Sequence, residues 1–307
     1  MHTRPDNGHA VWVYPFNFAP TEDFSDYRRD ERGVPLVYYS HLQRWVYNPI
    51  TISQFGLAQV SHYAAQKSEA AKESAGIMAD WLVENLEDWK NGIGAWVYRF
   101  ELPLYGPVAP WISAMAQGQG LSLLLRARRL LQRPAYEAAS HRAVRAFYHT
   151  INDGGVARTF PDGGLAFEEY TTAEPSLVLN GMLFALLGLH DYAEHCDDAR
   201  ARECFAAGLA GVRANLWRYD TGYWNHYDLH RSRRLTSPDY VRIHVQLLRI
   251  FAKLAEEKYF ASVAQKWENY LNSYRCRGQY LAVKCAEKIR LQLGNYSTRP
   301  ESSSISA

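Results

Sequence analysis

Four prolines recur along the chain at nearly equal intervals of 61 to 65 residues, and an apolar stretch follows each of them. They are Pro49, Pro110, Pro175 and Pro238. Proline is well tolerated at the first position of a helix, because the N–H that it lacks would have no partner there. This spacing therefore predicts four apolar helices, each beginning at one of these prolines.

A second helical stretch, with charged residues on one side, follows each apolar stretch after a short break. These second stretches cover residues 68–86, 134–150, 198–216 and 258–273. A long period with little residue identity between its copies is typical of helical arrays and toroids. Alternating strand and helix patterns are missing, which disfavours a doubly wound sheet. We predict an all-α fold, an incomplete α/α toroid of about four helical hairpins.

The two helices of each pair differ in their polar faces. The stretch that follows Pro175 is apolar almost all round, which is typical of a buried helix. In 198–216 one face is apolar, and Arg200 and Glu203 fall on the opposite face. That apolar face carries Phe205, Leu209, Val212 and Leu216. We therefore predict that the first helix of each pair lies in an inner ring and that the second lies outside it.

Long loops join each outer stretch to the next inner one, and they cover 88–109, 152–174 and 219–237. Each contains glycine turns, and the first and third contain aromatic alternation, GAWVYRF and GYWNHYDL, which predicts short β-hairpins. Loops of this length in a compact domain are usually functional. All three lead into the starts of inner helices. We therefore expect their residues to meet in a cleft at one mouth of the toroid.

Three regions follow from this pattern. The periodic body covers residues 37–273 and shows no linker. Residues 1–36 are rich in Pro, Asp and Arg, so we expect an irregular N-terminal segment. For residues 274–307 we expect a C-terminal helix and a polar, serine-rich, disordered tail. The sequence thus predicts one toroid domain with two loosely held ends.

The composition is that of a soluble, cytoplasmic protein. The chain has 307 residues, 47% of them apolar and 21% charged, and a formal net charge of +2, which gives no global argument for nucleic acid or a membrane surface. No stretch approaches the roughly 20 apolar residues of a membrane span, and the N-terminus lacks the apolar core of a signal peptide. The four cysteines show no CxxC spacing, so we expect reduced thiols.

Residues suited to binding a sugar acid gather at the expected mouth. Aromatic rings stack on a pyranose, amides bind its hydroxyls, and arginine binds its carboxylate through two parallel hydrogen bonds. The acidic and aromatic candidates in the loops and in the last inner helix are Glu168, Glu169, Tyr170, Tyr227 and Tyr240. The other candidates are Arg231, His244, Gln54, Gln117, Asn180 and Tyr47.

Each candidate also has a purely structural interpretation. The chain has 21 Tyr and 9 Trp, so most of these must serve in packing. An amide inside an inner helix commonly bonds a neighbouring loop, and Glu168 and Glu169 can act as charges ahead of a helix. His226 and His230 lie four apart, but they have neither a third ligand nor an HExxH frame, so we expect no metal site.

Four longer motifs resemble a known family: AMAQGQ (114–119), EEYTTAEPSLVLNGMLFALLGLHDY (168–192), YDTGYWNHYDL (219–229) and DYVRIHVQLL (239–248). They closely resemble the C-terminal catalytic domain of the D-glucuronyl C5-epimerases of heparosan and heparan sulfate, and the resemblance extends from about residue 45 to 273. It implies an α/α barrel that converts glucuronic to iduronic acid within a polymer, without a nucleotide or redox cofactor. It also implies an anionic polysaccharide as the partner and a homodimer as the assembly.

Carried over by motif, the resemblance places the family's catalytic residues on Glu169, Tyr170, Tyr227 and Tyr240. The family usually has Arg directly after YDL, whereas here His230 comes first and Arg231 second. This leaves Arg231, His230 and Arg242 as candidates for the cation that binds the carboxylate, with Arg231 preferred.

Two further departures concern the last motif and the region ahead of the toroid. Val241 stands where the family's DYH signature has His, while His244 remains. The resemblance does not extend to the β-sandwich that precedes the barrel in animal members, so the calcium site and the glycan-binding surface of that region are not carried over. The substrate-binding residues that we expect are Arg231, His230, Asn180, His244, Gln54, Gln117 and Tyr47.

The expected reaction removes a proton beside a carboxylate and returns one to the opposite face. It needs acid–base groups on both faces of C5 and donors that hold the developing charge. Glu169 and Tyr240 come from different repeats and can flank the sugar, with Glu169 as the base from glucuronate and Tyr240 as the donor on the other face. Tyr170, Tyr227 and Arg231 would bind the carboxylate.

Other functions remain open on sequence grounds. Polysaccharide lyases also use α/α toroids and abstract the C5 proton, but they then expel the substituent at C4. A non-catalytic glycan-binding toroid would keep the aromatics and Arg without needing Glu169 to face Tyr240. A helical scaffold for proteins is disfavoured by the long aromatic loops at one mouth.

Overall fold

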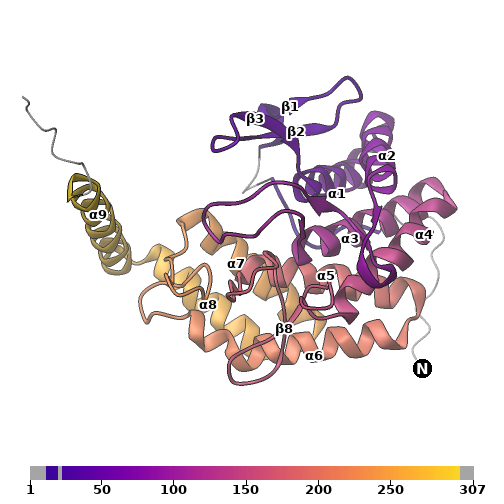
Figure 1. Cartoon of the computed structure of the whole chain (residues 1–307). Coiled ribbons are helices and arrows are strands. Elements are labelled where there is room, and N and C mark those ends of the chain that lie inside the picture. Colours follow the sequence, from indigo (N-terminus) through magenta and orange to yellow (C-terminus); the bar gives the residue numbers. More distant parts are fainter. Residues whose placement is uncertain (1–11, 20–22, 298–307) are drawn as a thin grey trace, which may run out of the picture.

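The computed structural model describes residues 12–19 and 23–297, and α-helices dominate it (Figure 1). Helices follow one another in four pairs, as the period predicts. The pairs are α1 (Pro49–Gln66) with α2 (Glu69–Glu84), α3 (Ala114–Leu131) with α4 (Pro134–Ala143), α5 (Leu179–Cys196) with α6 (Ala199–Asn215), and α7 (Pro238–Leu254) with α8 (Lys258–Asn272). Short 3₁₀ helices extend α4 (Val144–Tyr148) and α6 (Leu216–Tyr219).

The first helices of the pairs form the inner wall. Helix α3 packs against α1 and α5, α5 also packs against α7, and each second helix packs against its own partner. Helices α3 and α5 approach closely at facing glycines, since a Cβ on Gly188 would overlap the backbone carbonyl of Gly118. Both helices are buried along most of their length. This arrangement confirms the incomplete α/α toroid, with inner and outer helices as predicted.

Two of the four prolines begin helices and two do not. Pro49 and Pro238 are the first residues of α1 and α7, behind the capping residues Asn48 and Ser237. The predictions for Pro110 and Pro175 were wrong, because α3 begins only at Ala114 and α5 only at Leu179.

Long-range contacts explain both late starts. Residues 111–112, directly after Pro110, are extended in a strand pair with residues 97–98. Residues 176–177, directly after Pro175, donate backbone N–H groups to the carboxylate of Glu168 at 3.0 and 2.9 Å. In both places the backbone N–H groups and carbonyls are therefore used outside the helix.

The long loops carry short antiparallel strand pairs. Strand β4 (Glu87–Asp88) pairs with β5 (Gly94–Ala95), β6 (Val97–Tyr98) with β7 (Trp111–Ile112), and β8 (Ala157–Thr159) with β9 (Leu165–Phe167). A 3₁₀ turn (Lys90–Gly92) connects the first pair. The GAWVYRF segment thus contributes to two strand pairs rather than to one hairpin. The hairpin predicted for GYWNHYDL is reduced to isolated bridges at Asp220–Asn225 and His226–Leu235.

A three-stranded antiparallel sheet precedes the toroid and lies above α1 in Figure 1. Its strands are β1 (Arg28–Arg29), β2 (Pro35–Tyr39) and β3 (Arg44–Tyr47), and a 3₁₀ turn (Phe24–Asp26) leads into it. The expected boundary between residues 36 and 37 therefore cuts through β2. The segment before it is also anchored, since Tyr14, Phe16 and Phe18 are buried and Phe16 contacts Phe184 edge-on at 4.9 Å between ring centroids. The described part of this segment is thus mostly irregular, and buried aromatic side chains hold it against the toroid.

The C-terminal helix α9 (Tyr274–Ser297) extends away from the toroid in Figure 1. Its base is held by Tyr280, which stacks on Trp224 at 4.6 Å between ring centroids. The tail that we expect to be disordered lies beyond residue 297, outside the described residues. The four cysteines are unpaired, as predicted. No helix in the described part of the chain is long and apolar enough to span a bilayer.

Candidate active site

The three long loops meet beside the N-terminal ends of the inner helices. Leu179, at the start of α5, donates its backbone N–H to the carbonyl of Tyr227 in the third loop at 3.1 Å. Ala114, at the start of α3, donates to the carbonyl of Glu168 in the second loop at 2.9 Å. These bonds confirm that the loops converge at one mouth of the toroid.

A cavity of about 340 Å³ opens at this mouth. Every long loop contributes to its wall, as do the start of α7 and one residue of α9. The polar and aromatic residues that line it are Tyr105, Tyr170, Tyr227, Arg234, Ser237, Tyr240 and Lys284. Three of the predicted catalytic tyrosines thus share one cavity, and Tyr105 and Arg234 join them without having been predicted.

Glu169 lies behind this wall and is only 5% exposed. Its Oε2 atom accepts no hydrogen bond from any group that the structure describes. The carboxylate fits against α5 because residue 181 is glycine, where a Cβ would overlap Oε2. Burial raises the pKa of Glu169 to about 7, against a hydrogen bond with the Tyr170 side chain that lowers it, while the charge of Glu168 adds to the rise and that of Arg234 opposes it. A base whose pKa lies near neutral pH is suited to proton transfer.

Glu168, its neighbour, has a structural role. Its carboxylate accepts hydrogen bonds from the Ser176 and Leu177 backbone N–H groups at 3.0 and 2.9 Å and from Ser176 Oγ at 2.5 Å, and it pairs with Arg158 at 3.0 Å. These contacts hold the segment between β9 and α5 in place. Both carboxylate oxygens of Glu168 therefore accept hydrogen bonds, whereas Oε2 of Glu169 accepts none from the described residues.

Tyrosine rings form the walls of the cavity. Tyr105 stacks on Tyr170 at 4.5 Å between ring centroids, and Tyr227 meets Tyr240 edge-on at 5.1 Å. Burial raises the pKa of Tyr170 and of Tyr227 well above the usual range, and the charge of Glu169 raises both further. Both hydroxyls therefore keep their protons at neutral pH and can serve as hydrogen-bond donors. Tyr240 is 39% exposed, at the rim of the cavity.

Two cations line the cavity: Lys284, which pairs with Glu287 at 2.9 Å, and Arg234, which lies between tyrosine rings. Its guanidinium carbon lies 4.9 Å from the centroid of the Tyr105 ring and 5.2 Å from that of Tyr227. Asp228, which is fully buried, accepts from Arg234 Nε at 3.0 Å and from the Tyr105 hydroxyl at 2.7 Å. Arg234 Nη2 also donates to the Tyr105 hydroxyl. The guanidinium is thus fixed between two aromatic rings.

The three cations expected from the sequence do not line the cavity, although the His230 ring meets the Tyr105 ring edge-on at 5.6 Å between centroids. The side chain of Arg231 is 78% exposed, and its Nε lies 3.5 Å from Glu174. His230 approaches the same carboxylate at 3.6 Å and contacts Ser232 at 2.9 Å. Arg242 pairs with Asp239 on the surface of α7 at 2.6 Å. None of these three is among the described residues that line the cavity.

A reversal of the third loop explains this difference. Arg233 has a positive φ of 40°, and its N–H donates to the carbonyl of His230 at 2.8 Å. The chain then runs back, so that the Tyr227 N–H donates to the carbonyl of Arg234 at 2.8 Å. Counting along the sequence from YDL therefore misplaces the cation by three positions. No sequence motif marks Tyr105 as a site residue, since it is one of 21 tyrosines in the chain.

The predicted amides differ in what they bond. Gln117 is fully buried, accepts from the Trp96 N–H at 3.1 Å, and donates to the carbonyls of Gly94 and Ala143, both at 3.0 Å. Its polar atoms are used within the protein. Asn180 is buried in the first turn of α5, next to Gly181, and its Oδ1 has no partner in the described part of the chain. Gln54 is half-buried in α1.

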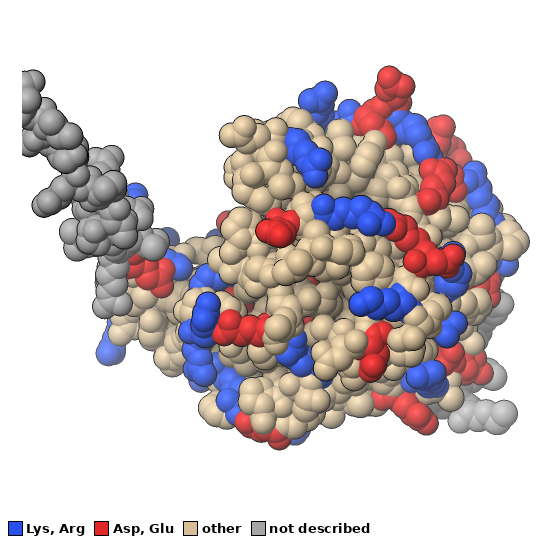
Figure 2. Space-filling model, viewed as in Figure 1, with Lys and Arg blue, Asp and Glu red and all other residues tan. Residues whose placement is uncertain are grey.

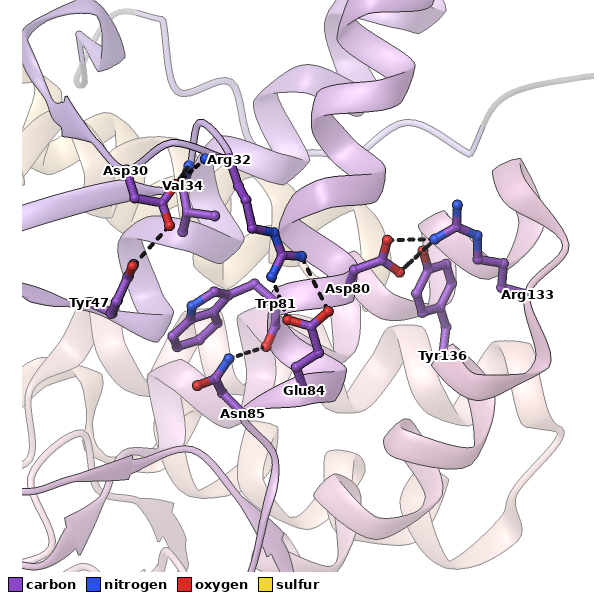
Figure 3. A network of polar contacts seen from close by, with 10 residues as sticks. All are labelled: Asp30, Arg32, Val34, Tyr47, Asp80, Trp81, Glu84, Asn85, Arg133 and Tyr136. Atoms are coloured by element: carbon purple, nitrogen blue, oxygen red, sulfur yellow. Dashed lines mark hydrogen bonds and ion pairs between the residues drawn. The ribbon is translucent and has the colours of Figure 1, made fainter.

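His244 and Tyr47 also lie outside the cavity wall. Burial lowers the pKa of His244 to about 3, so its imidazole is neutral and cannot act as the cation. Its Nδ1 lies 2.8 Å from Asn225 Nδ2, and its ring stacks on Tyr227 at 6.4 Å between centroids, which positions Tyr227. The Tyr47 hydroxyl donates to Asp30 at 2.9 Å beside a different cavity, close to Trp81 (Figure 3).

One trio of potential metal ligands occurs within residues 12–19 and 23–297. Glu137, His141 and Cys196 place their ligand atoms within 4.8 Å of one another. Cys196 is the last residue of α5, so the trio lies at the end of the toroid opposite the cavity. His226 and His230, whose spacing was considered above, are not part of it.

Comparisons with known proteins show the family of this chain. The model of the D-glucuronyl C5-epimerase C-terminus matches residues 90–269, which include every tyrosine and the arginine of the cavity. A D-glucuronyl C5-epimerase of Caenorhabditis elegans is 32% identical over 243 residues, which are 72% of this chain and 39% of that protein. An uncharacterized protein of Methanocaldococcus jannaschii is 30% identical over 178 residues, 56% of each chain. The chain thus spans about half, or less, of the length of these relatives.

The fold has counterparts among solved structures. The unsaturated glucuronyl hydrolase of Bacillus sp. GL1, described as responsible for the degradation of glycosaminoglycan, superposes with a TM-score of 0.50 at 18% identity. The superposition covers 73% of this chain and 62% of the hydrolase, and at this identity it supports the fold alone. Since the family model covers more than half of the chain, this protein belongs to the D-glucuronyl C5-epimerase family.

Proposed function

We propose that this protein is an epimerase that inverts C5 of glucuronic acid residues, giving iduronic acid, in a heparosan-like polysaccharide. The observation that carries the proposal is a buried carboxylate, Glu169, with a pKa of about 7 behind a cavity walled by tyrosines and one fixed arginine. This set supplies a base, proton donors and a carboxylate-binding cation at one place. Family membership supports the same reaction class.

In the proposed reaction, ionised Glu169 takes the C5 proton of glucuronate. The C5–H electron pair moves toward the carboxylate, which becomes an enolate with two negative charges. Tyr240 then donates its phenolic proton to C5 from the opposite face, and the enolate electrons form the new C–H bond. Atoms and charges balance when Glu169 and Tyr240 exchange protons with solvent after product release. The reverse reaction uses the two groups in exchanged roles.

The developing charge needs donors that are already in place. The Tyr170 and Tyr227 hydroxyls keep their protons, because burial and the charge of Glu169 raise the pKa of both. Arg234 adds a positive charge, and its contacts with Asp228 and Tyr105 restrict its movement. We therefore propose Arg234, rather than Arg231, as the group that binds the uronate carboxylate. Its attraction grows as the enolate forms, so it favours the transition state over the bound substrate.

Solvent-exchange labelling tests the proposal. Heparosan incubated with the protein in deuterated water should acquire deuterium at C5 of its uronic acids, and iduronic acid should appear in the polymer. The same sample should show no rise in ultraviolet absorbance, since only elimination of the C4 substituent produces a conjugated, unsaturated sugar. Absorbance that rises together with exchange would identify a lyase. Binding of heparosan without any exchange would identify a glycan-binding protein.

A further inference from the structure

A second cavity, of about 350 Å³, lies between the three-stranded sheet and strand β6. We call it the sheet-side cavity. Its lining includes aromatic and basic side chains, among them Arg44, Trp45, Tyr47, Trp81, Tyr98 and Arg99. Three of them lie on β3, and Trp81 comes from the end of α2. Arg44, Trp45, Tyr47 and Trp81 precede the residues 90–269 that the family model matches.

Exposed aromatic faces are the first mark of this cavity. Trp45 is 41% exposed and Tyr47 is 40% exposed. Figure 3 shows Tyr47 beside Trp81, and their ring centroids are 5.5 Å apart. The Tyr47 hydroxyl is tethered to Asp30, which fixes the angle of its ring. The Arg28 guanidinium carbon lies 5.7 Å from the centroid of the Trp45 ring, so the surfaces suited to stacking on the apolar face of a sugar are the exposed remainder of that ring and the Tyr47 ring.

Positive charge is the second mark. Arg44 is exposed and makes no ion pair with any described residue. Arg99 pairs with Glu87, which also lines the cavity, and this pair is exposed on both sides. One arginine therefore remains unbalanced beside the aromatic faces. Acidic and basic side chains are otherwise interspersed over the face in Figure 2, without a large patch of one sign.

Aromatic rings connect this cavity to the catalytic one. Tyr98 lines the sheet-side cavity, and its ring stacks on Trp111 at 4.2 Å between centroids. Trp111 lies 5.7 Å from Tyr170, which lines the catalytic cavity. Only two ring-to-ring contacts thus separate the two cavities. Tyr98 and Trp111 are themselves buried, at 4% and 3% exposed, so a chain of sugar residues that reaches both cavities would pass over the surface above these rings.

We propose that the sheet-side cavity binds an acidic sugar residue of the same polysaccharide whose glucuronate occupies the catalytic cavity. The inference rests on the proposed function for the identity of the polymer. Stacking on Trp45 would hold the sugar ring, and Arg44 would bind its carboxylate. Contacts this far from C5 strengthen binding equally in the ground and transition states, so they lower KM without raising kcat.

Heparosan oligosaccharides of increasing length, titrated calorimetrically, test this site. For the wild-type protein, affinity should rise once the oligosaccharide is long enough to reach both cavities. Trp45→Ala should weaken binding of the long oligosaccharide about tenfold, which corresponds to roughly 1.4 kcal/mol, and should remove most of the gain with length. Arg44→Ala should weaken it less, and the loss should shrink as salt is raised, because an exposed charge is screened.

Trp217→Ala is the matched control. Trp217 is also an exposed tryptophan, at 61%, with the guanidinium of Arg218 lying 4.8 Å from its ring centroid, but it lines a separate cavity beside α8. This variant should bind every oligosaccharide as the wild type does. If Trp45→Ala loses no more affinity than Trp217→Ala, the sheet-side cavity is not a binding site for the polymer.

The two proposals fail separately. Binding needs no turnover, so length-dependent affinity that Trp45→Ala removes, without any C5 exchange, would support the sheet-side site and overturn the proposed function. The opposite result is C5 exchange by the wild type together with an affinity that still rises with oligosaccharide length in Trp45→Ala. That result would support the function and overturn the sheet-side site. Circular dichroism should show all variants folded, as expected for changes at exposed side chains.

Discussion

Arg234 donates to the same carboxylate oxygen of Asp228 through both Nε and Nη2, at 3.0 and 2.8 Å. Asp228 is fully buried, whereas Arg234 reaches the cavity wall. The buried carboxylate therefore fixes the position of the guanidinium at the cavity. Breaking a buried pair by removing one partner leaves an uncompensated charge and typically costs about 3–5 kcal/mol. A test of Arg234 must therefore keep its charge.

Arg234→Lys should lower kcat for C5 exchange by at least about a hundredfold, with a smaller change in KM. Lysine keeps the charge but loses the planar group whose Nε and Nη2 hold Asp228, so the charge loses its fixed position at the cavity. The contact is expected to strengthen as the enolate forms, so its loss falls mainly on kcat. Steady-state exchange kinetics measure both constants.

Arg231→Lys is the control for this change, as an arginine of the same loop that is exposed and paired only with Glu174. We expect its kinetics to stay within about twofold of the wild type, as surface substitutions usually have small effects. A loss at Arg231 that equals the loss at Arg234 would return the carboxylate-binding role to Arg231.

The pKa of about 7 at Glu169 predicts a pH dependence of activity. The base must be ionised, so kcat/KM should rise about tenfold per pH unit below neutrality and level off above pH 7. A profile measured by C5 exchange from pH 5 to 9 checks this. A plateau that already begins near pH 5 would mean that Glu169 has an ordinary acidity or is not the base.

The same shift predicts a stability difference between the wild type and Glu169→Gln. The folded-state pKa of Glu169 lies above its unfolded value near 4.5, so the folded state holds the proton more tightly and loses stability as pH rises from about 4.5 to 7. Glutamine removes this penalty. Glu169→Gln should therefore be more stable than the wild type at pH 8, by about 1–3 kcal/mol, and the gain should vanish below about pH 4.5.

Chemical denaturation at pH 4.5 and 8 measures this difference. Taking the variant minus the wild type cancels other titrating groups, such as His244, whose lowered pKa acts with the opposite sign, since it removes stability as pH falls. A variant that is less stable than the wild type at pH 8 would contradict the burial of an ionisable carboxylate at this position.

Gln117→Leu should reduce stability rather than substrate binding. It would leave the Trp96 N–H and the carbonyls of Gly94 and Ala143 without their partner in the interior. Each buried polar group left unpaired costs about 1–3 kcal/mol, so we expect a loss of at least about 3 kcal/mol in the free energy of unfolding. The KM of the folded fraction, measured at low temperature, should stay near the wild-type value. A raised KM with unchanged stability would restore Gln117 as a substrate ligand.

Local patterns in the sequence predicted the helical pairs, because helix periodicity and a proline at the first helical position act over a few residues. The late starts of α3 and α5 depend instead on contacts between distant segments, such as the hydrogen bonds from residues 176–177 to Glu168. No local signal after Pro175 marks them.

In the candidate site, too, local patterns predicted some residues and long-range contacts determine the others. Glu169, Tyr170, Tyr227 and Tyr240 sit in motifs or at helix starts that the period places at one mouth. The structure brings the three tyrosines into one cavity, and Glu169 lies buried behind its wall. Arg234 is reached only through the reversal at Arg233, a backbone conformation that the run HRSRR does not reveal. Gln117 interrupts an apolar helix just as a ligand would, and only its three partners identify it as structural.

The central claim is that Glu169 and Tyr240 transfer protons on opposite faces of C5, and deuterium incorporation at C5 of heparosan tests it most directly. Glu169→Gln and Tyr240→Phe keep side-chain volume and remove only the transferring group, so both variants should fold. We expect each to lower the rate of incorporation at least about a hundredfold, the usual worth of such catalysis. Incorporation by either variant at more than about a tenth of the wild-type rate would contradict the role assigned to that residue.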